Sequence, residues 1–297
     1  MAQLLKLEDC ISRYEADVFR YTGQYTRLKR DRWERVKTNW EDRINSTVSS
    51  RDPQEPVDDK KWWRKRSEQP EILLENFYIK ADISSIEELK TQFMDEIFRF
   101  QLKWASSTLT EKSRLSHSTP SDSCLKFLLT ELPDNYLLLY KPILQMKNAA
   151  TQLDVILIGP DSVHCLVFID ISTDTIVTGT KGRFWSSVEA KQSQQMISPV
   201  PAIQRMNYFL DRCVNLTLLD LKVHYTLVAK EGIINNDTTP SYIKIIDQRT
   251  FKDWHLRLKR QPSPIKFKQL KAAKAIIEHG VSSSYKRPEW DSKNNWD

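Results

Sequence analysis

The sequence is poor in glycine, with six among 297 residues. Neither of the glycine-rich phosphate-binding patterns, GxGxxG and GxxxxGK[ST], is present. Nucleoside-triphosphate chemistry and dinucleotide-dependent redox chemistry are therefore not expected. An apolar run of about 18 residues, which a membrane-spanning helix needs, is also missing. We therefore predict neither a membrane span nor a membrane partner.

Cysteine is scarce as well, and the four cysteines are far apart: Cys10, Cys124, Cys165 and Cys213. The sequence has no CxxC pattern, no HExxH pattern and no cluster of cysteine with histidine. Disulfides and a structural zinc ion are thus not expected, and a reducing compartment fits best. Glu8 and Asp9 stand where a signal peptide needs basic and then apolar residues. The sequence therefore predicts a cytoplasmic protein.

Positive charge is present in excess but is unevenly distributed. The formal net charge is +6, and residues 249–274 alone hold nine basic residues and one acid. A second basic segment, residues 60–66, contains two tryptophans. Basic residues interleaved with aromatic ones suit a phosphate backbone with stacked bases, although solvated helix faces give the same pattern. We interpret the two segments as a surface for DNA or RNA, formed by Lys61, Arg64, Arg66, Arg257, Lys259 and Arg260.

Hydrophobic periodicity divides the chain into three parts. Residues 1–110 are predicted to be a helical N-terminal region with a linker, residues 121–280 an α/β domain, and residues 281–297 a polar tail. Apolar residues at steps of three and four predict a helix over 84–104. In the second part, strands are predicted at 136–140, 152–158, 163–171, 176–177, 221–229 and 242–246, and helices at 124–132, 198–213, 248–258 and 266–279. This order predicts an α/β fold with helices on both sides of a central mixed sheet.

Two of the predicted strands carry a carboxylate within an otherwise apolar run, at Asp154 and Asp170. A five-residue loop over 160–164 would make these two residues directly opposed on one face of the sheet. Two carboxylates so placed would repel each other unless a cation such as Mg²⁺ or Mn²⁺ lay between them. The alternative is that each carboxylate lies solvated at a strand end.

The order of several short motifs resembles the nuclease-related domain (NERD) family, a branch of the PD-(D/E)xK nucleases. The resemblance covers residues 121–258 and rests on Leu132-Pro133-Asp134-Asn135-Tyr136, Gln152-Leu153-Asp154-Val155-Ile156, Val167-Phe168-Ile169-Asp170-Ile171-Ser172, Trp185, Ser198-Pro199 and Gln204. It implies a restriction-endonuclease-like sheet, metal ligation by Asp154 and Asp170, and a catalytic role for Gln204.

The sequence departs from that family where the nuclease site needs a positive charge. Ser172 takes the place of the catalytic lysine, and Lys181 and Lys191 lie downstream as substitutes. A serine hydroxyl cannot offset the transition-state charge. The resemblance therefore implies a degenerate nuclease, a pseudoenzyme that binds nucleic acid or a partner without efficient cleavage. Two alternatives remain: an active Mg-dependent nuclease that uses Lys191 or Lys181, and a protein-interaction scaffold.

Overall fold

The computed structural model describes residues 1–48, 83–147, 149–190, 192–214, 216–235, 238–261 and 263–287. The chain forms two compact units, one of Met1–Tyr25 with Phe98–Asp297 and one of Thr26–Ile97. Within the described ranges, no helix is long and apolar enough to cross a membrane.

The smaller unit contains the greater part of two helices, α2 (Val18–Val48) and α3 (Ile86–Trp104). Aromatic contacts join them: the rings of Trp33 and Phe93 meet edge to face with centroids 5.1 Å apart. The indole N–H of Trp40 donates to the carbonyl of Ile83 at 3.1 Å. At the start of α3, the hydroxyl of Ser85 accepts from the backbone N–H of Glu88, which satisfies one of the free donors of the first turn. The helix predicted over 84–104 is confirmed.

The larger unit is built on a six-stranded sheet in the order β1-β3-β6-β7-β11-β13. β7 runs parallel to β11 and β11 to β13, whereas β6 is antiparallel to both of its neighbours, so the sheet is mixed. The six strands are β1 (Gln3–Leu7), β3 (Leu137–Tyr140), β6 (Val155–Ile158), β7 (Ser162–Phe168), β11 (Lys222–Val228) and β13 (Ile243–Ile246). The expected mixed α/β architecture is confirmed.

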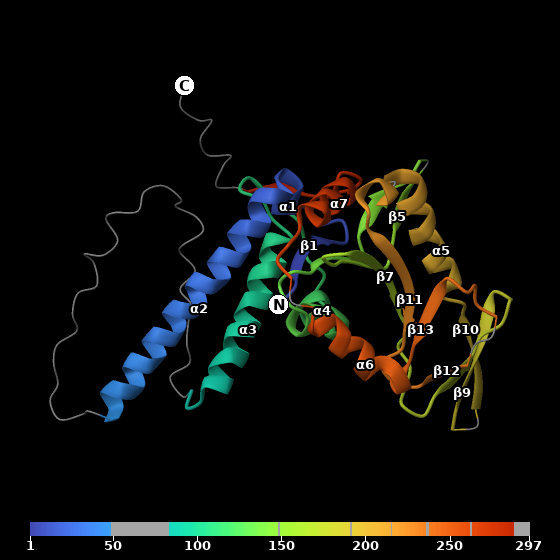
Figure 1. Ribbon diagram of the computed structural model, residues 1–297, viewed down its shortest axis with the longest axis horizontal. Coiled ribbons are helices and arrows are strands. Elements are labelled where there is room, and N and C mark those ends of the chain that lie inside the picture. Colours follow the sequence, from blue (N-terminus) through green and yellow to red (C-terminus); the bar gives the residue numbers. More distant parts are fainter. Residues whose placement is uncertain are drawn as a thin grey trace. The chain divides into compact units, whose positions relative to one another are not determined.

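Helices cover this sheet because its central strands are apolar on both faces. All residues of β3 and β6 are buried, which fits strands with helices on either side. Figure 1 shows α5 on one side of β11 and α6 on the other. The helices of this unit are α1 (Arg13–Ala16), α4 (Ser123–Glu131), α5 (Val200–Phe209), α6 (Gln248–Lys259) and α7 (Phe267–Ile277), with short helical turns at η2 (Thr119–Ser121), η3 (Leu210–Val214) and η4 (Leu216–Leu219).

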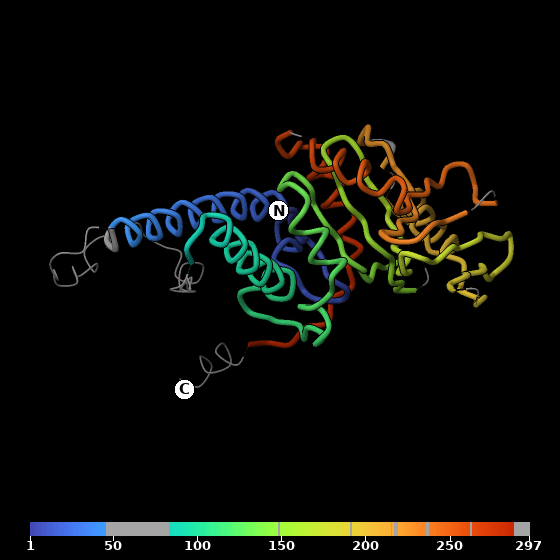
Figure 2. The backbone as a smooth tube through the Cα atoms, turned by 90° about the horizontal axis from the view of Figure 1, so that it is seen from below, coloured from blue at the N-terminus to red at the C-terminus, as the bar shows by residue number. Residues whose placement is uncertain are grey.

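The first residues of the chain form a strand within the N-terminal region that was predicted to be helical. β1 pairs in parallel with β3 and is entirely buried. Figure 2 shows these blue N-terminal residues among the green and red segments of the larger unit. The sequence Gln-Leu-Leu-Lys-Leu does not indicate a buried strand, because a lysine is not expected in one. Lys6 is buried nonetheless, since its ammonium donates to Glu15 at 2.6 Å and to the carbonyl of Cys10 at 2.8 Å.

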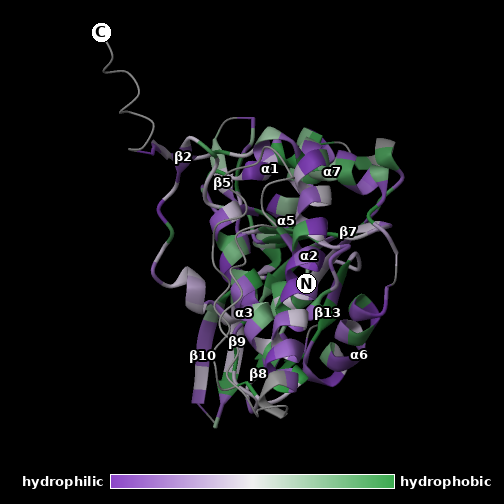
Figure 3. Ribbon diagram, turned by 90° about the vertical axis from the view of Figure 1, so that its left-hand side faces the viewer, coloured by the Kyte–Doolittle hydropathy of each residue, from purple (hydrophilic) through white to green (hydrophobic). Residues whose placement is uncertain are grey.

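A second sheet of four strands follows β7, in the order β10-β9-β8-β12. Its strands are β8 (Ile176–Thr178), β9 (Phe184–Glu189), β10 (Gln192–Ile197) and β12 (Ile233–Asn235). β9 and β10 form a hairpin in a stretch for which no strand was predicted, and Figure 3 shows β10 as largely hydrophilic. The ring of Trp185 in β9 is buried. Two-stranded pairs complete the unit: β4 (Ile143–Gln145) with β5 (Ala150–Gln152), and β2 (Glu111–Lys112) with β14 (Tyr285–Lys286).

The register between β6 and β7 differs from the expected one. Ile158 pairs with Val163, and the turn between them closes through a hydrogen bond from the Gly159 N–H to the Ser162 carbonyl at 2.8 Å. A Cβ on Gly159 would lie 2.9 Å from a ring carbon of Tyr136, so this close approach requires glycine. The loop is therefore shorter than the five residues assumed, and the predicted opposition of two aspartates is wrong.

Candidate functional site

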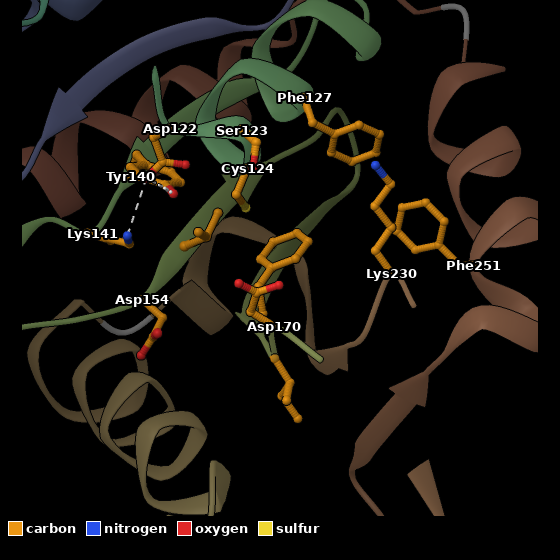
Figure 4. Close-up of a pocket in the computed structure, with 13 residues that line it drawn as sticks. Asp122, Ser123, Cys124, Phe127, Tyr140, Lys141, Asp154, Asp170, Lys230 and Phe251 are labelled. Carbon is orange, nitrogen blue, oxygen red and sulfur yellow. Dashed lines mark hydrogen bonds and ion pairs between the residues drawn. The ribbon is translucent and has the colours of Figure 1, made fainter. Parts of the chain in front are cut away.

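A cleft of about 360 Å³ opens where β3, β6 and β7 meet α4 and α6. Its lining combines carboxylates, lysines and aromatic rings (Figure 4), and the residues are Asp122, Ser123, Cys124, Phe127, Tyr140, Lys141, Asp154, Val155, Phe168, Ile169, Asp170, Lys230 and Phe251. We call this site the carboxylate cleft. Two of the predicted catalytic residues, Asp154 and Asp170, thus border one cavity.

Asp122 is fixed by its local structure and is the N-cap of α4. One of its carboxylate oxygens accepts from the backbone N–H of Leu125 at 2.9 Å, and the other accepts from the Tyr140 hydroxyl at 2.8 Å. Burial opposes ionisation, but these hydrogen bonds and Lys141 together lower the pKa of Asp122. Burial raises the pKa of the neighbouring Cys124 thiol to about 12, so this thiol stays protonated and is a poor nucleophile.

Asp154 and Asp170 both border the cleft, but they are not cross-strand neighbours. Continuing the register of β6 and β7 by one step places Asp154 opposite Val167 rather than Asp170. In Figure 4 the carboxylate of Asp154 turns towards a neighbouring helix, whereas that of Asp170 lies in the centre of the cleft. Burial raises the pKa of Asp154, although Arg205 and Lys141 partly offset this effect. Neither carboxylate accepts a hydrogen bond from the described part of the chain.

A metal centre is not preformed in the part of the chain that the structure describes. No group of three or more histidine, cysteine, aspartate or glutamate side chains there is arranged to hold a metal ion. Binding of Mg²⁺ or Mn²⁺ by Asp154 and Asp170 therefore stays a prediction.

The other predicted site residues are not gathered at this cleft. Gln204 is exposed on α5 and is not among the lining residues. Ser172 donates to Glu189 at 2.5 Å, so its hydroxyl is engaged outside the cleft. Lys259 forms an ion pair with Glu131 at 3.0 Å. Arg257 and Arg260 are exposed, at and just after the end of α6. Four predicted residues lie outside the described ranges: Lys61, Arg64, Arg66 and Lys191.

A second constellation lies on one face of the parallel strands β7 and β11. His164 pairs in register with His224, and their rings stack with centroids 5.2 Å apart and an interplanar angle of 28°. The hydroxyl of Ser162 lies 2.9 Å from Nε2 of His164. His224 is exposed at the surface, and His164 is partly covered behind it. We call these two residues the histidine pair.

The surroundings of the histidine pair are cationic. Burial lowers the pKa of His164 to about 4, and His224 and Lys244 act in the same direction. Burial, Lys244 and Lys222 lower the pKa of His224. Both rings are therefore neutral at pH 7 and can accept a proton. Two lysines beside two imidazoles favour an anionic ligand such as a phosphate ester.

Sequence reasoning missed this pair because the two histidines are 60 positions apart and meet only through strand pairing. One weak signal was available. Each histidine has a hydroxyl residue two positions away, Ser162 before His164 and Thr226 after His224. The same spacing occurs at His117 and Thr119, which lie in the segment before α4.

Comparison with known proteins gives one partial likeness. The chain is 36% identical over 113 residues to a protein of Geobacillus stearothermophilus named RNA 2',3'-cyclic phosphodiesterase. The match includes 34% of this chain, and the chain spans about a third (36%) of that relative's length. No protein-family model matches the chain, and no solved structure matches it.

These findings correct the resemblance drawn from the sequence. The assignment to the nuclease-related domain family is wrong, because the relative carries the name of a different enzyme and no family model matches. The functions predicted from the sequence are corrected as well, because the name of the relative fits none of them: the degenerate nuclease or pseudoenzyme, the active Mg-dependent nuclease and the protein-interaction scaffold. The mixed α/β sheet stands, but a restriction-endonuclease-like arrangement is not confirmed.

Proposed function

We propose that this protein is a phosphodiesterase that opens 2',3'-cyclic phosphates at RNA ends, with the histidine pair as its acid and base. The observation that carries the proposal is the stacking of His164 on His224 beside two lysines. The named relative, which is 36% identical over 113 residues, supports the choice of substrate.

The reaction needs a base for water and an acid for the leaving oxygen. Water attacks phosphorus, and one of the two bonds from phosphorus to a ribose oxygen breaks. His164, which is neutral at pH 7, takes the proton of the water. His224 faces solvent and meets the substrate. The phosphate anion raises the pKa of both imidazoles, so that His164 can hold the proton taken from water and His224 can carry the proton that the ribose oxygen receives.

The two lysines act on the charge of the phosphate. Lys222 precedes His224 on β11, and Lys244 of β13 pairs in register with Thr226. By alternation along a strand, all these side chains share a face with the histidine pair. Their positive charge stabilises the extra negative charge on phosphorus in the transition state.

The test uses an RNA oligonucleotide that ends in a 2',3'-cyclic phosphate, with EDTA present throughout. We expect the full chain to convert it to a monophosphate end and His224→Ala to lower the rate by about 10²–10⁴. His117→Ala is the matched control, because this exposed histidine shares the hydroxyl spacing but lies on no strand of the sheet. Hydrolysis that survives in His224→Ala, or that His117→Ala abolishes, would contradict the assignment.

A further inference from the structure

We propose that the carboxylate cleft binds a guanine base, with Phe127 and Phe251 as stacking surfaces and Asp170 as acceptor of the N–H groups of the base. The inference rests on the proposed RNA-directed function for its choice of ligand. Its geometry is independent of the histidine pair, because none of the residues involved belongs to that pair.

The aromatic wall of the cleft comes from two helices that flank the sheet. Phe127 of α4 and Phe251 of α6 contact each other with ring centroids 5.7 Å apart and an interplanar angle of 37°. Both rings border the cleft and are only partly buried. Phe168 adds a third partly exposed ring from the end of β7. Partly exposed rings offer π-faces on which a base can stack.

The size of the cleft also suits such a ligand. Its volume of about 360 Å³ is at the lower end of the range of small-molecule sites, roughly 300–1,000 Å³. Such sites combine apolar walls with a few polar groups that fix orientation, as the phenylalanines and Asp170 do here.

The position of Asp170 decides which part of a nucleotide faces it. Figure 4 shows its carboxylate between the group formed by Asp122 and Tyr140 and the aromatic wall. A carboxylate repels a phosphate group but accepts hydrogen bonds from the donors on base edges. Asp170 accepts no hydrogen bond within the described residues, so its oxygens are available to a ligand.

Guanine matches a single carboxylate better than the other bases do. Its Watson–Crick edge presents two adjacent donors, N1–H and the N2 amino group, and a carboxylate presents two acceptor oxygens. Adenine and cytosine place one donor beside an acceptor, and uracil places one donor between two acceptors. Each of these three would bring an acceptor against an oxygen of Asp170.

Lys230 supplies the charge that a nucleotide phosphate needs at the rim of the cleft. It is exposed, and its Nζ lies 5.8 Å from the centroid of the Phe127 ring. A base on the aromatic wall therefore has an ammonium group beside it, within reach of its own phosphate.

The experiment titrates the full chain with GMP, AMP, CMP and UMP by calorimetry in EDTA. We expect GMP to bind most tightly. Asp170→Asn should lower GMP affinity about ten- to a hundredfold and remove the preference. Phe127→Leu should weaken all four nucleotides about tenfold. Asp154→Asn is the matched control in the same cleft, and it should leave GMP binding unchanged because its carboxylate turns away from the wall.

Three results would overturn the inference: no binding, equal binding of the four nucleotides, or a requirement for Mg²⁺ in which Asp154→Asn and Asp170→Asn are equally harmful. The last would identify a cation site in place of a base site. Circular dichroism of each variant separates loss of binding from loss of folding, and Phe251→Leu provides a second test of the wall. His224→Ala should bind GMP as the wild type does, so failure of the proposed hydrolysis and failure of this inference are distinguishable.

Discussion

The strand β7 connects two regions of opposite charge, one near each of its ends. Near its beginning, His164 stacks on His224, and Lys222 and Lys244 add positive charge there. Just beyond its end, Asp170 lies in a cleft with two further aspartates and aromatic rings. A phosphate is attracted to the first region and repelled from the carboxylates of the second. His164 and Asp170, six residues apart in the sequence, can therefore select different parts of a nucleotide: the first region suits the phosphate and the second suits the base.

The largest expected effect concerns cooperation within the histidine pair. Either His164→Ala or His224→Ala should lower the rate of cyclic-phosphate hydrolysis by about 10²–10⁴. Groups that act as a unit are not additive, so the double variant should be little slower than the slower single variant. Single-turnover rates of the three variants check this. Additive losses would mean that the two histidines act separately.

The next effect is a pH dependence of stability that comes from the histidine pair. His164 has a pKa of about 4 in the folded protein against 6.5 for the free side chain. The unfolded state therefore binds this proton more tightly, and stability falls as the pH drops from about 6.5 to about 4. The loss amounts to at most about 3 kcal/mol. His164→Gln should flatten this part of the curve of unfolding free energy against pH. A curve of unchanged slope would contradict the assignment.

A smaller effect should come from the lysines that set the cationic field. Replacing Lys222 and Lys244 together by glutamine should raise KM for the RNA about tenfold and make its salt dependence shallower, because fewer phosphate contacts release counterions. Lys141→Gln, in the carboxylate cleft and paired with Asp122, is the control and should not change the salt slope. Steady-state kinetics at several salt concentrations measure both. Equal slopes in wild type and double variant would show that these lysines do not contact the substrate.

The sequence predicts the elements of the larger unit well where their pattern is apolar. β3, β7, β11 and α6 all occur close to their predicted positions. These elements bury continuous apolar runs or a clear apolar stripe, which is a local property of the chain. The β9–β10 hairpin and β1 were not predicted, because they lack a continuous apolar pattern. β10 is polar, and β1 contains Lys6, whose burial depends on partners from elsewhere in the chain.

Neither site follows from local pattern alone, because each depends on pairing between distant strands. The register of β6 and β7 is set by a turn in which Gly159 packs against the ring of Tyr136, and the sequence does not show that contact. The histidine pair depends on β11 lying beside β7, and these strands are separated in the sequence by β8, β9, β10 and α5. Only the aspartates could be singled out in advance, because a carboxylate in an apolar strand is conspicuous by itself.

The smallest expected effect sharpens the contrast between the two regions through Asp154. Burial raises the pKa of this carboxyl group, so its ionised form destabilises the folded state at neutral pH. Asp154→Asn keeps the shape and removes the charge, and it should stabilise the protein by less than about 1 kcal/mol at pH 7. The gain should vanish in acid, where Asp154 is protonated in folded and unfolded protein alike. Urea unfolding of both proteins at pH 7 and in acid measures the difference.

Asp170→Asn is the matched comparison, since Asp170 is exposed and should give no gain at either pH. Destabilisation by Asp154→Asn at pH 7 would instead show that Arg205 and Lys141 outweigh the cost of burial.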